Sequence, residues 1–140
     1  MIRDALKTSD EQIAYALLRL IVGMNLMMHG VARILAGPGN FAAKLLEQFA
    51  QSPLPTWSVW GFAAMLPVLE GILGLLLLIG LRTRAVLIVS SFLLLALTFG
   101  STLVQDWSIA GTQLLYALVY SLLLFFHRYD AWSVDRLMQG

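Results

Sequence analysis

Four long apolar segments constrain this chain more than any other feature of its sequence. They cover residues 13–35, 57–81, 85–103 and 109–126. Each has roughly 18 to 25 residues, and a helix that rises about 1.5 Å per residue needs about 20 of them to cross the apolar core of a bilayer. The sequence therefore predicts an all-α integral membrane protein, a four-transmembrane-helix bundle that forms a single domain over residues 1–140.

Composition excludes several other classes of protein. Hydrophobic residues make up 59% of the chain and charged residues 12%, which is far from the balance of a soluble domain. The basic residues are scattered, so no nucleic-acid partner is expected. The chain has no cysteine and only two histidines, His29 and His127, which fall on opposite sides of the predicted membrane. We therefore expect no iron–sulfur cluster, no metal site and no covalent cofactor.

The segment between the first two apolar stretches predicts a short amphipathic helix. Gly37, Pro38 and Gly39 end the first helix, and the sequence SPLP at residues 52–55 precedes the second. Between them, the sequence FAAKLLEQFAQ places its Phe and Leu side chains close to one helical face. This helix is predicted to lie on the outer leaflet or to cap the bundle, either as a lid or as a route that admits a ligand.

The distribution of basic residues predicts the orientation in the membrane. Six of them fall on the side of both termini and two on the other side: Arg3, Lys7, Arg82, Arg84, Arg128 and Arg136, against Arg33 and Lys44. Cytoplasmic loops carry the excess of Lys and Arg, so both termini are predicted to be cytoplasmic. The first apolar segment is longer than a signal-peptide core and carries charge, so we expect it to remain as the first helix.

Glu70 lies near the centre of the second apolar segment, where an unpaired carboxylate is costly. The first segment offers partners in Arg19, Asn25, His29 and Arg33. These side chains fall within an arc of about 120° on one face of a helix. Polar side chains of a membrane helix face the bundle interior or a wet cavity, so this face is expected to point inward.

The rise of a helix predicts how deep each polar side chain lies. Counted from the cytoplasmic edge, Glu70 lies about 16 Å deep, Arg19 about 9 Å and Asn25 about 18 Å. Two layers follow: Arg19, Glu70, Asn25 and Tyr120 near mid-membrane, and His29 with Gln113 nearer the outer face. In the first layer, Arg19 is predicted to neutralise Glu70.

The inner layer has two interpretations. It is either a structural network that locks the first two helices together, or a site that handles a proton or orients a ligand. The second interpretation rests on a buried Glu changing its charge state when a bound molecule alters the local field. It makes Glu70 and Arg19 the candidate catalytic residues. The candidate cofactor-binding residues are then His29, Asn25, Gln113 and Tyr120.

Short motifs follow one another along nearly the whole chain. In order, they are Leu17-Leu18-Arg19, Gly23, His29-Gly30, Arg33, Leu54-Pro55, Glu70-Gly71, Gly74, Gly80-Leu81, Thr83-Arg84, Ser133, Asp135 and Arg136. Their order and spacing resemble the DoxX family of small four-helix bacterial membrane proteins. That family includes proteins similar to the small subunit of thiosulfate:quinone oxidoreductase. The resemblance implies a quinone-linked role in the bacterial inner membrane, with Arg19, His29 and Glu70 as the functional set.

The expected function is that of a membrane-embedded accessory or quinone-interacting subunit of an oxidoreductase. In this hypothesis Glu70 exchanges a proton, Arg19 biases its charge, and His29 with Gln113 hydrogen-bonds a quinone headgroup. The expected partners are the lipid bilayer and a membrane or redox protein, or further copies of the chain. Two alternatives stay open, a non-enzymatic scaffold or assembly subunit and a small-solute carrier, as does the question of whether the chain is catalytic at all.

Overall fold

The computed structural model describes residues 8–139, and the regular elements within this range are all helices. They are α2 (Asp10–Leu35), α3 (Pro38–Gln48), α4 (Thr56–Ile79), α5 (Thr83–Leu103), α6 (Trp107–Phe125), the 3₁₀ helix η1 (His127–Tyr129) and α7 (Val134–Gln139). Among them α2, α4, α5 and α6 are long and apolar enough to cross a membrane. The predicted all-α bundle of four such helices, with a short amphipathic helix between the first two, is confirmed.

The long helices begin one to three residues before the predicted ranges, and polar side chains cap the starts of α2 and α6. At the start of α2, the backbone nitrogen of Gln12 donates to Ser9 Oγ at 3.2 Å, and that of Ser9 donates to Gln12 Oε1 at 3.1 Å. This reciprocal pair satisfies two donors that the first turn of a helix would otherwise leave free. At the start of α6 there is a single capping bond, in which the side chain of Asp106 accepts from the backbone nitrogen of Ile109 at 3.2 Å.

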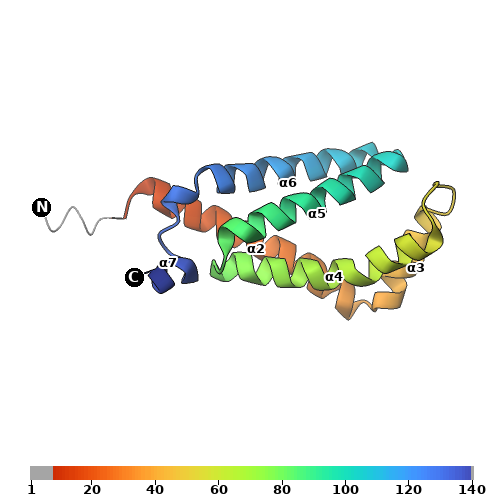
Figure 1. The fold of residues 1–140 in the computed structure, drawn as a ribbon, viewed down its shortest axis with the longest axis horizontal. Helices are drawn as coiled ribbons and strands as arrows, with labels where there is room; N and C mark the ends of the chain where they lie inside the picture. The colour runs from red at the N-terminus through yellow and green to blue at the C-terminus, as the bar shows by residue number, and fades with distance from the viewer. Residues whose placement is uncertain (1–7, 140) are drawn as a thin grey trace, which may run out of the picture.

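The four long helices pack as two antiparallel pairs, α2 with α4 and α5 with α6 (Figure 1). Glycines let the backbones of the first pair approach closely. A Cβ on Gly23 would lie 2.6 Å from the backbone nitrogen of Leu78, and one on Gly30 would overlap the backbone of Pro67 and Gly71. Small residues at a helix interface are the usual device for such packing in membranes. The α2–α4 pair is therefore fixed in register by Gly23 and Gly30.

The hydrophobic core lies where the two pairs meet. Leu77 of α4, Leu87 of α5 and Leu123 of α6 are completely buried there, and Leu26 of α2 belongs to the same cluster. In Figure 1 the pairs are closest at the end that carries α7. Side chains that lie further toward the α3 end enclose cavities between the pairs.

The outer surface of the bundle is apolar, as expected of a surface that meets lipid. Large hydrophobic side chains are exposed along all four long helices. Tryptophans near the ends of these helices are more than half exposed: Trp57, Trp60, Trp107 and Trp132. Indole rings favour the headgroup zone of a bilayer, so their positions fit helices that span it.

Candidate functional site

A cavity of about 240 Å³ lies between the two helix pairs. Five of the six predicted site residues line it: Asn25 and His29 from α2, Glu70 from α4, and Gln113 and Tyr120 from α6. The rest of its polar lining is Arg33, Ser90, Ser108, Thr112 and Tyr116. The structure thus gathers into one site residues that the sequence divided between two layers. Only Arg19 among the predicted six lies elsewhere.

Glu70 forms its ion pair with Arg33 of α2, so the predicted pair of Glu70 with Arg19 is wrong. Glu70 is 4% exposed, so the guanidinium of Arg33 compensates a buried negative charge. Arg33 also lies over the ring of Phe41 in α3, with its Cζ 4.5 Å from the ring centroid. This one side chain therefore connects the buried acid to the amphipathic helix.

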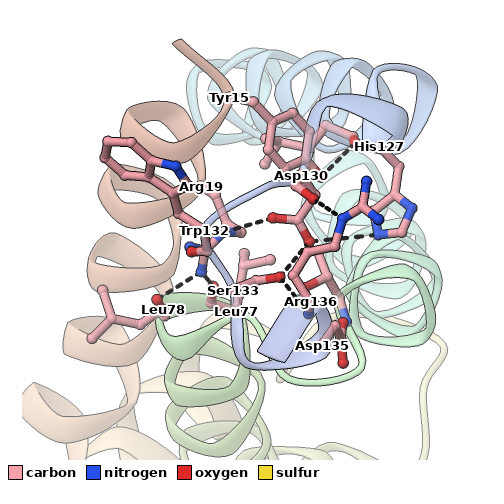
Figure 2. A network of polar contacts seen from close by, with 12 residues as sticks. Tyr15, Arg19, Leu77, Leu78, His127, Asp130, Trp132, Ser133, Asp135 and Arg136 are labelled. Carbon is pink, nitrogen blue, oxygen red and sulfur yellow. Dashed lines mark hydrogen bonds and ion pairs between the residues drawn. The ribbon is translucent and has the colours of Figure 1, made fainter. Parts of the chain in front are cut away.

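Arg19 has a structural position near the opposite end of the bundle (Figure 2). Its side chain is 2% exposed, and its guanidinium donates to the carbonyl oxygens of Leu77, Leu78 and Trp132, each at 2.7 Å. The first two are among the last carbonyls of α4, which have no partner within the helix. A cation at a helix C-terminus satisfies them and offsets the negative end of the helix dipole.

The register of α2 against α4 explains this correction. The prediction placed the terminal-side ends of both helices at the same depth. In the structure, Gly23 meets Leu78 and Gly30 meets Pro67, so the first turns of α2 extend beyond the end of α4 (Figure 1). Glu70 therefore lies level with the turn that carries Arg33, roughly two helical turns from the predicted level. Gly30 and Gly71, which meet in the structure, are the pair whose alignment gives this register.

His29 presents one ring nitrogen for use at the site. Its Nδ1 lies 2.7 Å from the backbone oxygen of Asn25, and a carbonyl only accepts, so Nδ1 carries the proton. In the neutral ring, Nε2 is then a hydrogen-bond acceptor. The ring of Tyr116 packs edge-on against the imidazole with centroids 6.4 Å apart. These contacts orient His29 at the rim of the cavity, where both it and Asn25 are exposed.

Two buried polar atoms of the cavity lining have no hydrogen-bond partner within residues 8–139, Gln113 Oε1 and Ser90 Oγ. Gln113 is 8% exposed and Ser90 is 2% exposed. Buried polar groups are rarely left unpaired, so these two atoms are positioned to meet a bound molecule or water. The sequence analysis missed Ser90, because a single Ser within an apolar helix gives no distinguishing pattern.

The segment after α6 docks onto the end of the bundle through a second polar network (Figure 2). Asp135 accepts from the backbone nitrogens of Arg82 at 2.7 Å and Thr83 at 2.8 Å, which caps the start of α5. Asp130 accepts from Ser133 Oγ at 2.8 Å. Desolvation raises the pKa of Asp135, but the hydrogen bonds from Thr83 and Arg82 outweigh it, so the pKa lies below its ordinary value.

Three potential metal ligands occur in the same network. Atoms of His127, Asp130 and Asp135 lie within 4.8 Å of one another. Both oxygens of Asp135 already accept backbone hydrogen bonds, and Arg19 Nε lies 3.8 Å from Asp130 Oδ1. The protein's own cation and donors thus offset these carboxylates, as in a structural junction.

Comparison with known proteins identifies a family. No curated protein and no solved structure matches the chain. The family model for the methylamine utilisation protein MauE matches residues 11–113, which is well over half of the 140 residues. This finding overturns the expected membership of the DoxX family. With its long apolar helices, the chain is a multi-pass membrane protein, and it belongs to the family of the methylamine utilisation protein MauE.

Proposed function

We propose that this protein is a membrane accessory component of an oxidoreductase system and that it binds a quinone-type molecule between its two helix pairs. Membership of a family named for methylamine utilisation supports the accessory role. The main support for a bound ligand is the polar cavity, in which the buried oxygens of Gln113 and Ser90 have no hydrogen-bond partner within the described residues. They lie in the same lining as the Glu70–Arg33 pair.

The donors and acceptors of the cavity suit the two redox states of a quinone. A quinone carbonyl accepts hydrogen bonds, which the amide nitrogen of Gln113 and the guanidinium of Arg33 can donate. A quinol hydroxyl donates, and both Gln113 Oε1 and the Nε2 of neutral His29 can accept. A quinone is also soluble in the bilayer, and so reaches a cavity inside the membrane.

Glu70 is the group that we assign to proton exchange with this ligand. Its carboxylate is buried beside a single guanidinium, so a bound molecule that changes the local field also changes the balance between the charged and neutral acid. Arg33 takes the part that the sequence analysis gave to Arg19. The chain has no cysteine for dithiol chemistry, so we assign the electrons to the ligand and to a partner redox protein.

We further propose that the protein lies in the bacterial cell membrane with both termini in the cytoplasm. Arg82, Arg84, Arg128 and Arg136 all belong to the end of the bundle that carries α7, which supports this orientation. The cavity includes Ser108 and Thr112, from the first turns of α6 at the α3 end. In this orientation the cavity runs from about the middle of the membrane, where Ser90 and Tyr120 line it, toward the outer face.

Binding of a short-chain quinone to purified protein in mild detergent tests the proposal. We expect wild type to bind it and Gln113→Leu to weaken binding at least about tenfold, because that variant removes the amide from the cavity. Gln51→Leu changes the same residue type at an exposed loop position and serves as the control. If wild type does not bind the quinone, or if both variants bind it equally well, the proposed ligand is refuted. The alternative of a non-enzymatic scaffold would then be favoured.

A proton measurement tests the part played by Glu70. Reduction of the bound quinone is expected to take up protons in wild type, and Glu70→Gln is expected to suppress this uptake while quinone binding persists. The variant keeps the shape of the side chain and its ability to accept from Arg33. Normal uptake in Glu70→Gln would remove Glu70 from the mechanism.

A further inference from the structure

A second cavity, of about 510 Å³, lies beneath the amphipathic helix α3. Its lining comes mainly from α3, the residues just after it, α4 and α5. Apolar side chains dominate it: Phe41, Leu45, Phe49, Phe62, Leu66 and Phe99. Its volume falls within the range of about 300–1,000 Å³ that is common for small-molecule sites. Apolar cavities hold water poorly, so this lining suits a hydrocarbon group.

The second cavity adjoins the polar cavity. Four residues line both of them: Arg33, Leu97, Ile109 and Gln113. The buried amide of Gln113, whose Oε1 finds no partner among residues 8–139, therefore lies at the junction. One side of this junction offers Glu70 and His29, and the other offers phenyl and leucyl side chains. The two cavities together match a molecule with a polar head and an apolar tail.

We propose that the cavity beneath α3 holds the hydrocarbon tail of the ligand whose headgroup occupies the polar cavity; this inference rests on the proposed function. The ligand is thus a tailed quinone rather than a small free one. Arg33 links the two parts, because it pairs with Glu70 and lies over Phe41 of α3. The tail would therefore contact α3 directly, and the headgroup would be linked to the same helix by Arg33, which contacts Phe41.

Helix α3 and the residue that follows it cover this cavity. The helix is short, amphipathic and packed mainly on α4, and Ala42 is its one buried residue within the described chain. Phe49 lies beside Gly100 of α5, where an added Cβ would come within 3.2 Å of its ring. Phe49, the residue that follows α3, therefore closes the cavity toward α5 with its side chain rather than with backbone.

Tail length and a cavity-filling variant test the inference together. Ala96 lines the cavity beneath α3 and is exposed, so Ala96→Phe projects a phenyl group toward the tail position. We expect this variant to weaken binding of an isoprenoid-tailed quinone at least about tenfold, because overfilling is costly. Binding of the tail-less headgroup analogue is expected to stay unchanged, which also shows that the variant is folded. Ala64→Phe places the same group on an exposed face of α4 outside both cavities and is the control.

Photolabelling locates the tail directly. A quinone with a diazirine at the end of its tail is expected to label α3 and the neighbouring part of α4 around Phe62. Label confined to outward-facing residues such as Phe92 would overturn the inference, as would equal loss of tailed and tail-less binding in Ala96→Phe. A phospholipid bearing the same diazirine distinguishes the source of the tail; if it labels the cavity and the quinone does not displace it, the inference is also overturned. Failure of the tail-less analogue to bind wild type would instead refute the proposed function itself.

Discussion

Replacing Arg19 with Met tests whether this residue holds the fold together or serves the ligand site. Methionine keeps a long unbranched side chain in the α2–α4 interface but removes the guanidinium. Three carbonyl oxygens then lose a donor, those of Leu77, Leu78 and Trp132. The carboxylate of Asp130, which is 3% exposed, loses its neighbouring cation. The variant thus leaves several buried acceptors uncompensated.

The expected cost follows from these contacts. A hydrogen bond to a charged group contributes about 1.5–3 kcal/mol, and removing one member of a buried ion pair costs about 3–5 kcal/mol. The contacts share one guanidinium and Met avoids the cost of burying a charge, so the contributions do not add. We expect Arg19→Met to lower the free energy of unfolding by about 3–5 kcal/mol.

Unfolding by a denaturing detergent, followed by circular dichroism, measures this change. Arg84→Met is the matched control, because Arg84 is exposed at the same end of the bundle; its effect is expected to stay within about 0.5 kcal/mol. Folded Arg19→Met protein is expected to bind the short-chain quinone as wild type does. A variant that unfolds like the control but no longer binds quinone would show that Arg19 belongs to the ligand site, and the reasoning from register would be refuted.

Three further predictions address other contacts. Asp135→Asn is expected to lower the free energy of unfolding by about 1 kcal/mol, because it weakens the cap of α5. The pKa of Asp135 is lowered in the folded protein, so its contribution to stability is full above about pH 4 and is lost as the pH falls through the folded pKa. Limited proteolysis is therefore expected to release the segment after α6 from wild type in acid, with no matching acid step in the variant. Arg33→Met and Glu70→Gln are expected to show a coupling of about 1–3 kcal/mol in a double-mutant cycle of unfolding, and additive effects would contradict their ion pair. Gly30→Leu is expected to cost about 3 kcal/mol or more in the same unfolding assay because its side chain meets backbone, whereas Gly61→Leu points into open space and is expected to be tolerated.

The apolar segments were sufficient to predict the helices, because each segment carries its own length and hydropathy. The amphipathic helix was predictable for the same reason, from the spacing of Phe41 and Leu45. Helix starts were off by up to three residues because caps such as Ser9 and Asp106 are polar and fall outside the apolar pattern. Local features of the chain were therefore predicted well.

The partner of Glu70 was not predictable by the same means. Arg19 and Arg33 lie on the same face of α2, and choosing between them needs the register of α2 against α4. That register depends on the contacts of Gly23 and Gly30 with the backbone of α4. A contact of this kind involves two helices, so the pattern within one helix does not show it. Similarly, the role of Arg19 depends on Trp132, in a segment whose docking leaves no periodic pattern.

Motif resemblance was also a weaker guide than the physical pattern. The motifs that suggested the DoxX family include Arg19, Gly80 and Ser133, which meet in one network: a Cβ on Gly80 would crowd both Ser133 and Arg19. Gly80 has φ +75°, a backbone conformation that glycine adopts readily. Residues of this kind allow helix ends to pack closely, and such packing recurs in families with different activities.

The link between Arg19 and Trp132 spans 113 positions of the chain, and it sets an order for biogenesis. The ribosome delivers the guanidinium to the translocon with the first span, long before the acceptor at Trp132 and the carboxylate of Asp130 are synthesised. The carbonyl acceptors on Leu77 and Leu78 arrive with α4, so α2 pairs with α4 through them before the rest of the chain is made. The acceptor at Trp132 and the carboxylate of Asp130 come last, so the surroundings of Arg19 are complete only when the segment after α6 has docked.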